Sequence, residues 1–201
     1  MISESSTLGF YGTAAAGALG GKDFPMKQKL YLAGKIGKND WRHRIIPGLR
    51  EASAGCLDCG SFVYTGPFFT SCDHGCQHGP NTHGVGLTPK EWCEPDPQMT
   101  PHQIWTRNHE AVRCSNGVFA YIDANDAYGT LVELGWAQEG SIPRWVLFGP
   151  NADPRQMWYS TQGATRVMRG VYEEELEGLF DDFIRLLLNR MRWSRQRGGA
   201  S

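Results

Sequence analysis

The stretch that decides the fold is residues 121–137, Tyr-Ile-Asp-Ala-Asn-Asp-Ala-Tyr-Gly-Thr-Leu-Val-Glu-Leu-Gly-Trp-Ala. Its first residues complete an apolar strand, Val118–Ile122, and its last residues have the pattern of a helix. Two carboxylates, Asp123 and Asp126, follow the strand, and a Gly-Thr turn leads into a helix that opens with Glu133. In open α/β sheets, ligands bind where the carboxyl end of a strand faces a helix N-terminus. The stretch therefore predicts a site for a polar small molecule at this edge of a parallel sheet.

A purely structural interpretation of the same acids is also open. Thr130 and Glu133 have the spacing of a capping box, in which each side chain accepts a hydrogen bond from a backbone N–H of the first helical turn. Asp123 and Asp126 suit turns, because an Asp side chain readily bonds to its own following backbone. Against this interpretation, three carboxylates around one turn repel each other unless another group offsets the cost.

Strands and helices alternate along the rest of the chain, which is typical of a doubly wound α/β fold with a parallel sheet. The clearest predicted helix covers residues 172–193, where Leu, Phe, Ile and Met recur at the three-to-four spacing of one buried face. The other predicted strands cover 30–36, 61–69 and 144–148, and the other predicted helices begin near 40 and cover 100–114 and 131–138.

The composition is that of an ordinary globular protein. The 201 residues carry 20 lysines and arginines against 21 acids, a net charge of −1, which argues against a nucleic-acid partner. The apolar runs are much shorter than the ~18 residues that predict a membrane span, and the N-terminus lacks the charged-then-apolar pattern of a signal peptide. We therefore expect no membrane partner and a cytoplasmic protein.

We expect a single domain over residues 27–193, between two loosely ordered ends. Residues 1–26 are rich in Ser, Gly and Ala, a composition that buries little apolar surface. Residues 194–201 are expected to form a flexible basic tail, because a basic run at the end of a helix is usually solvated.

A family resemblance emerges from three segments taken together. Residues 126–137, Asp-Ala-Tyr-Gly-Thr-Leu-Val-Glu-Leu-Gly-Trp-Ala, resemble the acidic signature of the nucleoside 2-deoxyribosyltransferase family and its N-glycosidase relatives, where an Asp precedes a Gly-x-x-x-Glu-(Leu/Ile)-Gly-x-Ala segment. Residues 29–36, Lys-Leu-Tyr-Leu-Ala-Gly-Lys-Ile, resemble the family's first strand and its glycine turn beside the substrate. Residues 107–121 resemble the family's helix and the strand that follows it. In order, the resemblance covers residues 29–36 and 104–149.

The resemblance implies a flavodoxin-like, three-layer α/β/α domain that cleaves or exchanges the N-glycosidic bond of a nucleoside or nucleotide. It implies that Glu133 is the nucleophile that attacks the sugar C1′ and displaces the base, through an oxocarbenium-like transition state. Asp126 and Asp123 would hold the sugar hydroxyls or protonate the leaving base. No organic cofactor is required, because the glutamate itself supplies the covalent step. The resemblance also implies a homo-oligomer.

Two positions depart from the family pattern. Tyr128 adds a residue between Asp126 and Gly129, so either Asp126 or Asp123 occupies the family's acidic position. Asn108 stands where family members carry an Asp that contacts the base, and an amide offers donors as well as an acceptor. We therefore expect a different base preference and a shift from transfer between bases toward hydrolysis.

Several residues near the predicted strand ends are candidates for substrate binding. Lys35 follows Gly34 at a strand end and would pair with a phosphate of a nucleotide; a solvated lysine is the alternative. Asp40 and Trp41 lie in the next turn, where an aromatic ring stacks on a base or, alternatively, packs in the core. The predicted substrate-binding residues are Gly34, Lys35, Ile36, Asp40, Trp41, His74, Asn108, Tyr128 and Gly129.

A Cys/His-rich loop insertion interrupts the α/β pattern. Cys56-x-x-Cys59 and Cys72-x-x-x-Cys76 have a spacing close to that of structural zinc sites, so one interpretation is a structural zinc held by these four thiolates. In a second interpretation the insertion is a loop at the carboxyl edge of the sheet, and His74 contacts substrate. In a third, its histidines are solvated on the loop surface.

Two other functions stay open on the sequence alone. The same acids would serve a glycohydrolase that acts on NAD-type dinucleotides. Alternatively, the chain is a non-catalytic, zinc-stabilised binding module in which the acidic turn only caps a helix. The sequence leaves open the preferred base and sugar, the need for a 5′-phosphate, and whether water or a second base accepts the sugar.

Overall fold

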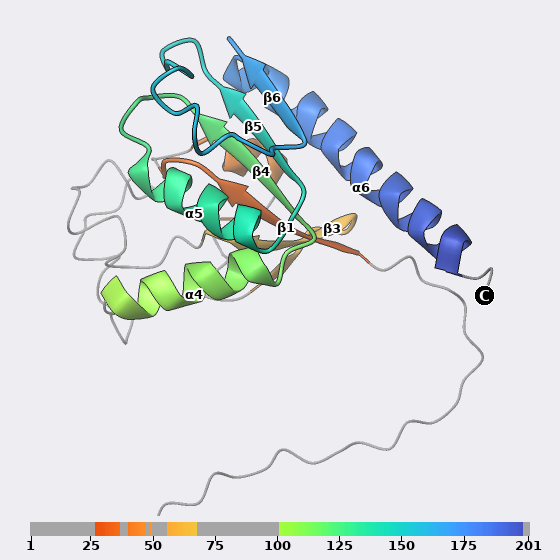
Figure 1. Cartoon of the computed structure of the whole chain (residues 1–201). Helices are drawn as coiled ribbons and strands as arrows, with labels where there is room; N and C mark the ends of the chain where they lie inside the picture. Colours follow the sequence, from red (N-terminus) through yellow and green to blue (C-terminus); the bar gives the residue numbers. More distant parts are fainter. Residues whose placement is uncertain (1–26, 37–39, 47–48, 50–55, 68–100, 199–201) are drawn as a thin grey trace, which may run out of the picture.

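The computed structural model describes residues 27–36, 40–46, 49, 56–67 and 101–198 (Figure 1). The predicted segment 1–26 and the insertion residues Cys72, His74 and Cys76 lie outside this part of the chain. The elements are β1 (Gln28–Ala33), α1 (Arg42–Ile45), β2 (Leu57–Asp58), β3 (Phe62–Gly66), α4 (Pro101–Arg113), β4 (Gly117–Ile122), α5 (Tyr128–Glu139), β5 (Arg144–Phe148), β6 (Arg166–Arg169), the 3₁₀ helix η3 (Glu173–Glu175) and α6 (Leu176–Gly198).

The six strands form one mixed sheet in the order β2-β3-β1-β4-β5-β6. β2 pairs with β3 in antiparallel fashion, and the other neighbouring pairs are parallel. The α/β class expected from the sequence is confirmed. Among the parallel strands, the first in the chain lies between the second and the third, an order compatible with a flavodoxin-like arrangement. The order reverses between β1 and β4, and such sheets bind ligands at this switch point.

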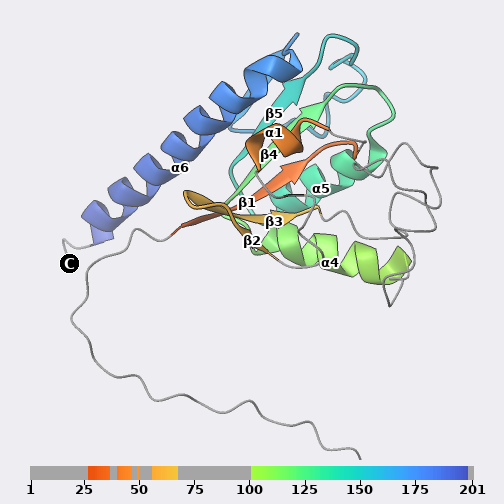
Figure 2. The ribbon, with the colours of Figure 1, turned by 180° about the vertical axis from the view of Figure 1, so that it is seen from behind.

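Helices cover both faces of the sheet (Figures 1 and 2). On the face of α1 and α6, Leu32 and Phe119 pack against Phe180 and Phe183 in one buried cluster. On the face of α4 and α5, a second buried cluster joins strand residues to apolar helix residues: Tyr31, Ala33, Val118, Ala120, Val112, Leu134 and Ala137. The two clusters use alternate residues of the same strands, because successive side chains of a strand point to opposite faces.

The C-terminal helix is longer at its end than the sequence pattern predicts. η3 covers Glu173–Glu175, and α6 runs on to Gly198, so residues 194–198, expected in a flexible tail, are helical. Among the helices of the described residues, none is long and apolar enough to cross a membrane.

Candidate active site

The turn after β1 brings two strands together at the switch point. Ala33 pairs in register with Ala120 of β4, and Gly34 follows directly. The φ angle of Gly34 is 154°, and a Cβ atom at this position would lie 2.7 Å from the carbonyl oxygen of Tyr121. Only glycine fits such a close approach of backbone to backbone. The predicted residue Gly34 therefore lies at the switch point, between the ends of β1 and β4.

A buried arginine holds the same turn. Arg42 is fully buried, and its Nε donates to the Leu32 carbonyl at 2.8 Å while its Nη2 donates to the Gly34 carbonyl at 2.6 Å. Its Nη1 pairs with Asp40 Oδ2 at 2.6 Å, which compensates the buried charge. Two charge-assisted hydrogen bonds thus fix the backbone of the β1 turn, and Asp40 supports it through its ion pair with Arg42.

Trp41 lies beside this arginine and is 3% exposed. Its ring packs against Phe119 and Tyr121, with centroids 5.9 and 6.1 Å away. Trp41 therefore packs in the core, which is the alternative interpretation given above for this residue. Contact of Asp40 or Trp41 with a substrate stays a prediction.

Helix α5 presents Glu133 to the sheet from its second turn. The helix begins at Tyr128, with Ala127 as N-cap and no side-chain capping bond. The capping box predicted for Thr130 and Glu133, and the expectation that the helix opens with Glu133, are therefore wrong. Glu133 is 8% exposed, and the Tyr31 hydroxyl of β1 donates to its Oε1 at 2.5 Å. The carboxylate is thus a buried group held from the neighbouring strand.

The Tyr31 side chain is built to donate this hydrogen bond. The residue is fully buried, and burial, followed by the negative charge of Glu133, raises the pKa of Tyr31 well above its ordinary value. The phenol therefore keeps its proton and holds one oxygen of the Glu133 carboxylate in place. No sequence pattern points to Tyr31, because it stands in an apolar strand 102 residues before its partner.

Lys35 and Asp126 form an ion pair beside the switch point between β1 and β4. Lys35 Nζ lies 2.7 Å from Asp126 Oδ2, and both side chains are about half exposed, at 54% and 55%. The hydrogen bond from Lys35 lowers the pKa of Asp126 below its ordinary value. The pair joins the turn after β1 to the loop before α5, which brings two of the predicted site residues together.

Asp123 follows β4 and is partly buried. Gly149, at the end of β5, lies so close that a Cβ there would be 3.1 Å from Asp123 Cα and 2.8 Å from the Tyr121 hydroxyl. The carbonyl of Ile122 accepts a hydrogen bond from Gly149 N–H at 2.8 Å. The two strand ends therefore meet closely enough to fix where Asp123 leaves the sheet.

The remaining predicted substrate-binding residues spread over several elements. Ile36 is buried after β1, and Asn108 is partly buried on α4. Tyr128 is 73% exposed at the start of α5, and Gly129 follows it on the exposed surface of that helix. His74 lies outside the described residues.

Of the four cysteines in the predicted zinc site, Cys56 and Cys59 lie in the described part of the chain. Cys56 is exposed with a free thiol, and Cys59 is partly buried, with a pKa raised by burial. Cys72 and Cys76 lie outside the described residues. Within residues 27–36, 40–46, 49, 56–67 and 101–198, no group of three or more His, Cys, Asp or Glu side chains is arranged to hold a metal ion.

No family model and no curated protein sequence matches the chain. The function of this protein is therefore inferred from its own residues and their geometry.

Proposed function

We propose that the chain cleaves or transfers the N-glycosidic bond of a nucleoside or nucleotide through a covalent glycosyl–Glu133 intermediate. The observation that carries the proposal is the buried Glu133 carboxylate, held at 2.5 Å by the Tyr31 hydroxyl beside the β1/β4 switch point. A buried acid with a fixed orientation at a ligand-binding edge is a candidate for covalent chemistry. In this proposal the fold is the flavodoxin-like, three-layer domain that the segment resemblance implies.

In the first half of the reaction, a carboxylate oxygen of Glu133 attacks C1′ of the sugar. The C1′–N bond breaks, and its electron pair leaves with the base, which takes a proton from Asp123 or from solvent. In the second half, water or another base attacks C1′ and gives up a proton to Asp123 or to solvent, the ester bond to Glu133 breaks, and the carboxylate is restored. Atoms and charge balance without an added oxidant or cofactor.

Tyr31 acts as a positioning residue in this scheme. Because its hydroxyl occupies Oε1, it fixes the plane of the carboxylate and aims the reacting oxygen at one place. A hydrogen bond in a buried environment is also electrostatically stronger than one in water, so this arrangement steadies the glutamate throughout the cycle.

The Lys35–Asp126 pair suggests how a substrate is recognised at the mouth of the site. A 5′-phosphate would compete with Asp126 for the Lys35 ammonium, and an exposed pair is cheap to rearrange because it contributes little to stability. Freed from Lys35, Asp126 would accept hydrogen bonds from the sugar hydroxyls.

The test is intact-protein mass spectrometry after incubation with a pool of nucleosides, 5′-nucleotides and NAD. We expect a glycosyl adduct or free base from the wild type, and at least a ~10³-fold lower rate from Glu133→Gln, because the nucleophile is lost. Glu139→Gln, which removes an exposed carboxylate at the end of the same helix, is the matched control and should keep full activity.

The outcomes separate the candidate functions. Nicotinamide released from NAD alone would identify the dinucleotide glycohydrolase. An inert wild type with stoichiometric zinc would support the non-catalytic binding module. Full activity in Glu133→Gln would overturn the assignment of the nucleophile.

A further inference from the structure

Helix α5 is apolar on its outer face as well as on the face that packs against the sheet. Tyr128 and Val132, one turn apart on the outer face, are 73% and 49% exposed, and Trp136 follows after one more turn, partly exposed. The exposed positions of α5 carry no charged side chain before Glu139, its last residue. A surface helix normally presents polar side chains to solvent, whereas a helix that is apolar all round is normally buried. The outer face of α5 therefore has the character of a covered surface.

Two glycines give this outer face an uneven shape. Gly129 and Gly135 flank Val132, three residues away on either side, so the three positions are neighbours on the helix surface. Both glycines are exposed, and a Cβ atom at either position would meet nothing within 4 Å. Glycine weakens a helix relative to alanine, but it lets another backbone approach closely. The face thus presents a protruding valine between two shallow hollows.

Trp105 extends the apolar surface from α5 onto the neighbouring helix α4. It is 49% exposed, and its ring stacks on those of His102 and His109, with centroids 6.1 and 5.3 Å away. The Trp136 ring meets it edge to face at 5.5 Å, so the aromatic surface continues from one helix to the other. Rings held in this way bury apolar area at little cost in conformational entropy. The name α4/α5 face is used below for these residues: Trp105, Tyr128, Gly129, Val132, Gly135 and Trp136.

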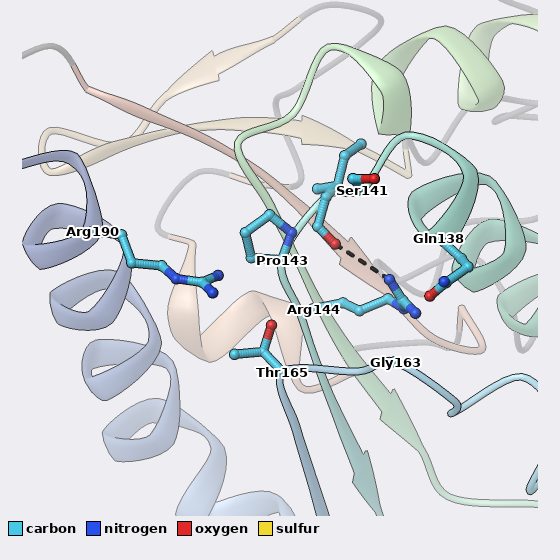
Figure 3. A pocket seen from close by; sticks show the side chains of 8 residues that line it. Gln138, Ser141, Pro143, Arg144, Gly163, Thr165 and Arg190 are labelled. Carbon is cyan, nitrogen blue, oxygen red and sulfur yellow. Dashed lines mark hydrogen bonds between the residues drawn. The ribbon is translucent and has the colours of Figure 1, made fainter. Parts of the chain in front are cut away.

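The segment between β5 and β6 lies on the same side of the sheet as the α4/α5 face. Its residue Met157 is buried in the cluster that also contains the inner face of α5. At the end of α5, Gln138 lies beside Gly163 of this segment (Figure 3), and a Cβ at Gly163 would be 2.9 Å from Gln138 Oε1. The same segment carries the exposed rings of Trp158 and Tyr159. Five of the eight exposed large apolar side chains in the described part of the chain therefore belong to elements on this one side.

We propose that the α4/α5 face is covered by the same face of a second copy of this chain, in a two-fold dimer. A two-fold interface must be complementary to itself, and this face combines a protruding Val132 with the hollows at Gly129 and Gly135 that can receive it. Like charges would oppose each other across the axis, and the face carries none. The exposed parts of Trp105, Tyr128 and Val132 amount to on the order of 300 Å². Two such patches supply the apolar centre of a standard interface of ~1,600 Å², whose polar rim comes from the bordering residues.

Analytical ultracentrifugation of the full chain over a range of concentrations tests the dimer. The wild type should sediment with twice the mass of 22.4 kDa. Val132→Asp and Val132→Lys should each raise the dissociation constant of the dimer at least ~100-fold, because each brings two like charges together at the axis. An equimolar mixture of the two variants should recover the dimer, since opposite charges then face each other. Val167→Asp is the matched control: it places the same charge at a valine that is 41% exposed on β6, and it should dimerise as the wild type does.

A second pair of variants tests the shape of the face. Gly135→Leu fills one hollow and should dissociate the dimer, whereas Gly178→Leu adds the same side chain at an open position of α6 and should not. A monomeric wild type, or a dimer that persists in both charged Val132 variants, would overturn the proposal. Dissociation without recovery in the mixture would also overturn it, because the face would then bind a surface other than itself. The measured mass does not depend on glycosidase activity, so the dimer and the proposed reaction can fail separately.

Discussion

At the scale of single residues, one hydroxyl should govern the proposed chemistry. Tyr31→Phe removes only the oxygen that donates to Glu133, and the aromatic packing in the core stays. We expect kcat to fall about ten- to hundredfold with little change in KM, because a hydrogen bond to a charged group is worth about 1.5–3 kcal/mol. Steady-state kinetics with the substrate found by mass spectrometry measures this.

Tyr64→Phe is the matched control for that substitution. Tyr64 is also fully buried, and its hydroxyl donates to the carbonyl of Pro67 rather than to a carboxylate. It should cost stability without a comparable fall in kcat. Equal kinetic losses in the two variants would show that Tyr31 contributes only to packing.

A second residue-scale prediction concerns alkaline pH. Tyr121 is 3% exposed and donates to the Val171 carbonyl, and burial, followed by the charge of Asp123, raises its pKa to about 12. An unfolded tyrosine ionises near pH ~10, so the folded state holds this proton more tightly. The resulting stability is fully present below pH ~10 and is lost as the pH rises through about 12.

Tyr121→Phe should therefore lose less stability than the wild type over that pH range. The difference in the change of unfolding free energy should be on the order of 2 kcal/mol. Urea unfolding at a series of alkaline pH values measures this difference. If the unfolding free energies of the wild type and of Tyr121→Phe fall in parallel as the pH rises, another group controls the loss of stability at alkaline pH.

At the scale of elements, the turn after β1 depends on Gly34. Gly34→Ala puts a Cβ 2.7 Å from the Tyr121 carbonyl and strains a backbone already held by Arg42. We expect a loss of about 1–3 kcal/mol in unfolding free energy, together with weaker substrate binding as Lys35 moves. Gly178→Ala is the control, because a Cβ there meets nothing within 4 Å in helix α6 and should stabilise it by up to ~1 kcal/mol. Equal thermal unfolding of the two variants would contradict this account of the turn.

The sequence located most elements, and its misses have physical reasons. β1, β3, β4, β5, α4 and α6 lie close to their predicted positions, because their apolar periodicity is strong. α5 begins at Tyr128, earlier than predicted, because Ala127 and Thr130 are buried against the sheet, and this packing outweighs the weak helix propensity of Gly129. β6 was not predicted, since this short strand carries an arginine at each end and has little buried surface, as is typical of a sheet edge.

The sequence likewise predicts only part of the candidate active site. Glu133 and Lys35 could be proposed from motifs, because their segments are short and continuous. The Tyr31–Glu133 contact could not, because it joins groups brought together only by the sheet order and by helix packing. Sequence patterns specify which residues share an element, whereas contacts between distant elements require the fold.

At the scale of the whole molecule, the segment between β5 and β6 exposes two large aromatic rings. Trp158 and Tyr159 are 60% and 79% exposed, and their rings contact each other edge to face with centroids 5.6 Å apart. Neighbouring exposed aromatic rings are common in protein interfaces, since they bury much apolar area with few rotatable bonds. We therefore predict that this segment contributes to a homo-oligomer.

Light scattering coupled to size exclusion measures the mass directly. The wild type should elute at a multiple of 22.4 kDa, and the double substitution Trp158→Ser with Tyr159→Ser should shift it toward the monomer. Trp193→Ser is the control, because that ring is 64% exposed on α6 and has no place in the predicted interface. A monomeric wild type would contradict the prediction, whereas an oligomer that dissociates only in Trp193→Ser would move the interface to α6.

If the double variant is monomeric and also loses glycosidase activity while Glu133 and Tyr31 are intact, the neighbouring subunit completes the active site, because neither substitution replaces those two residues.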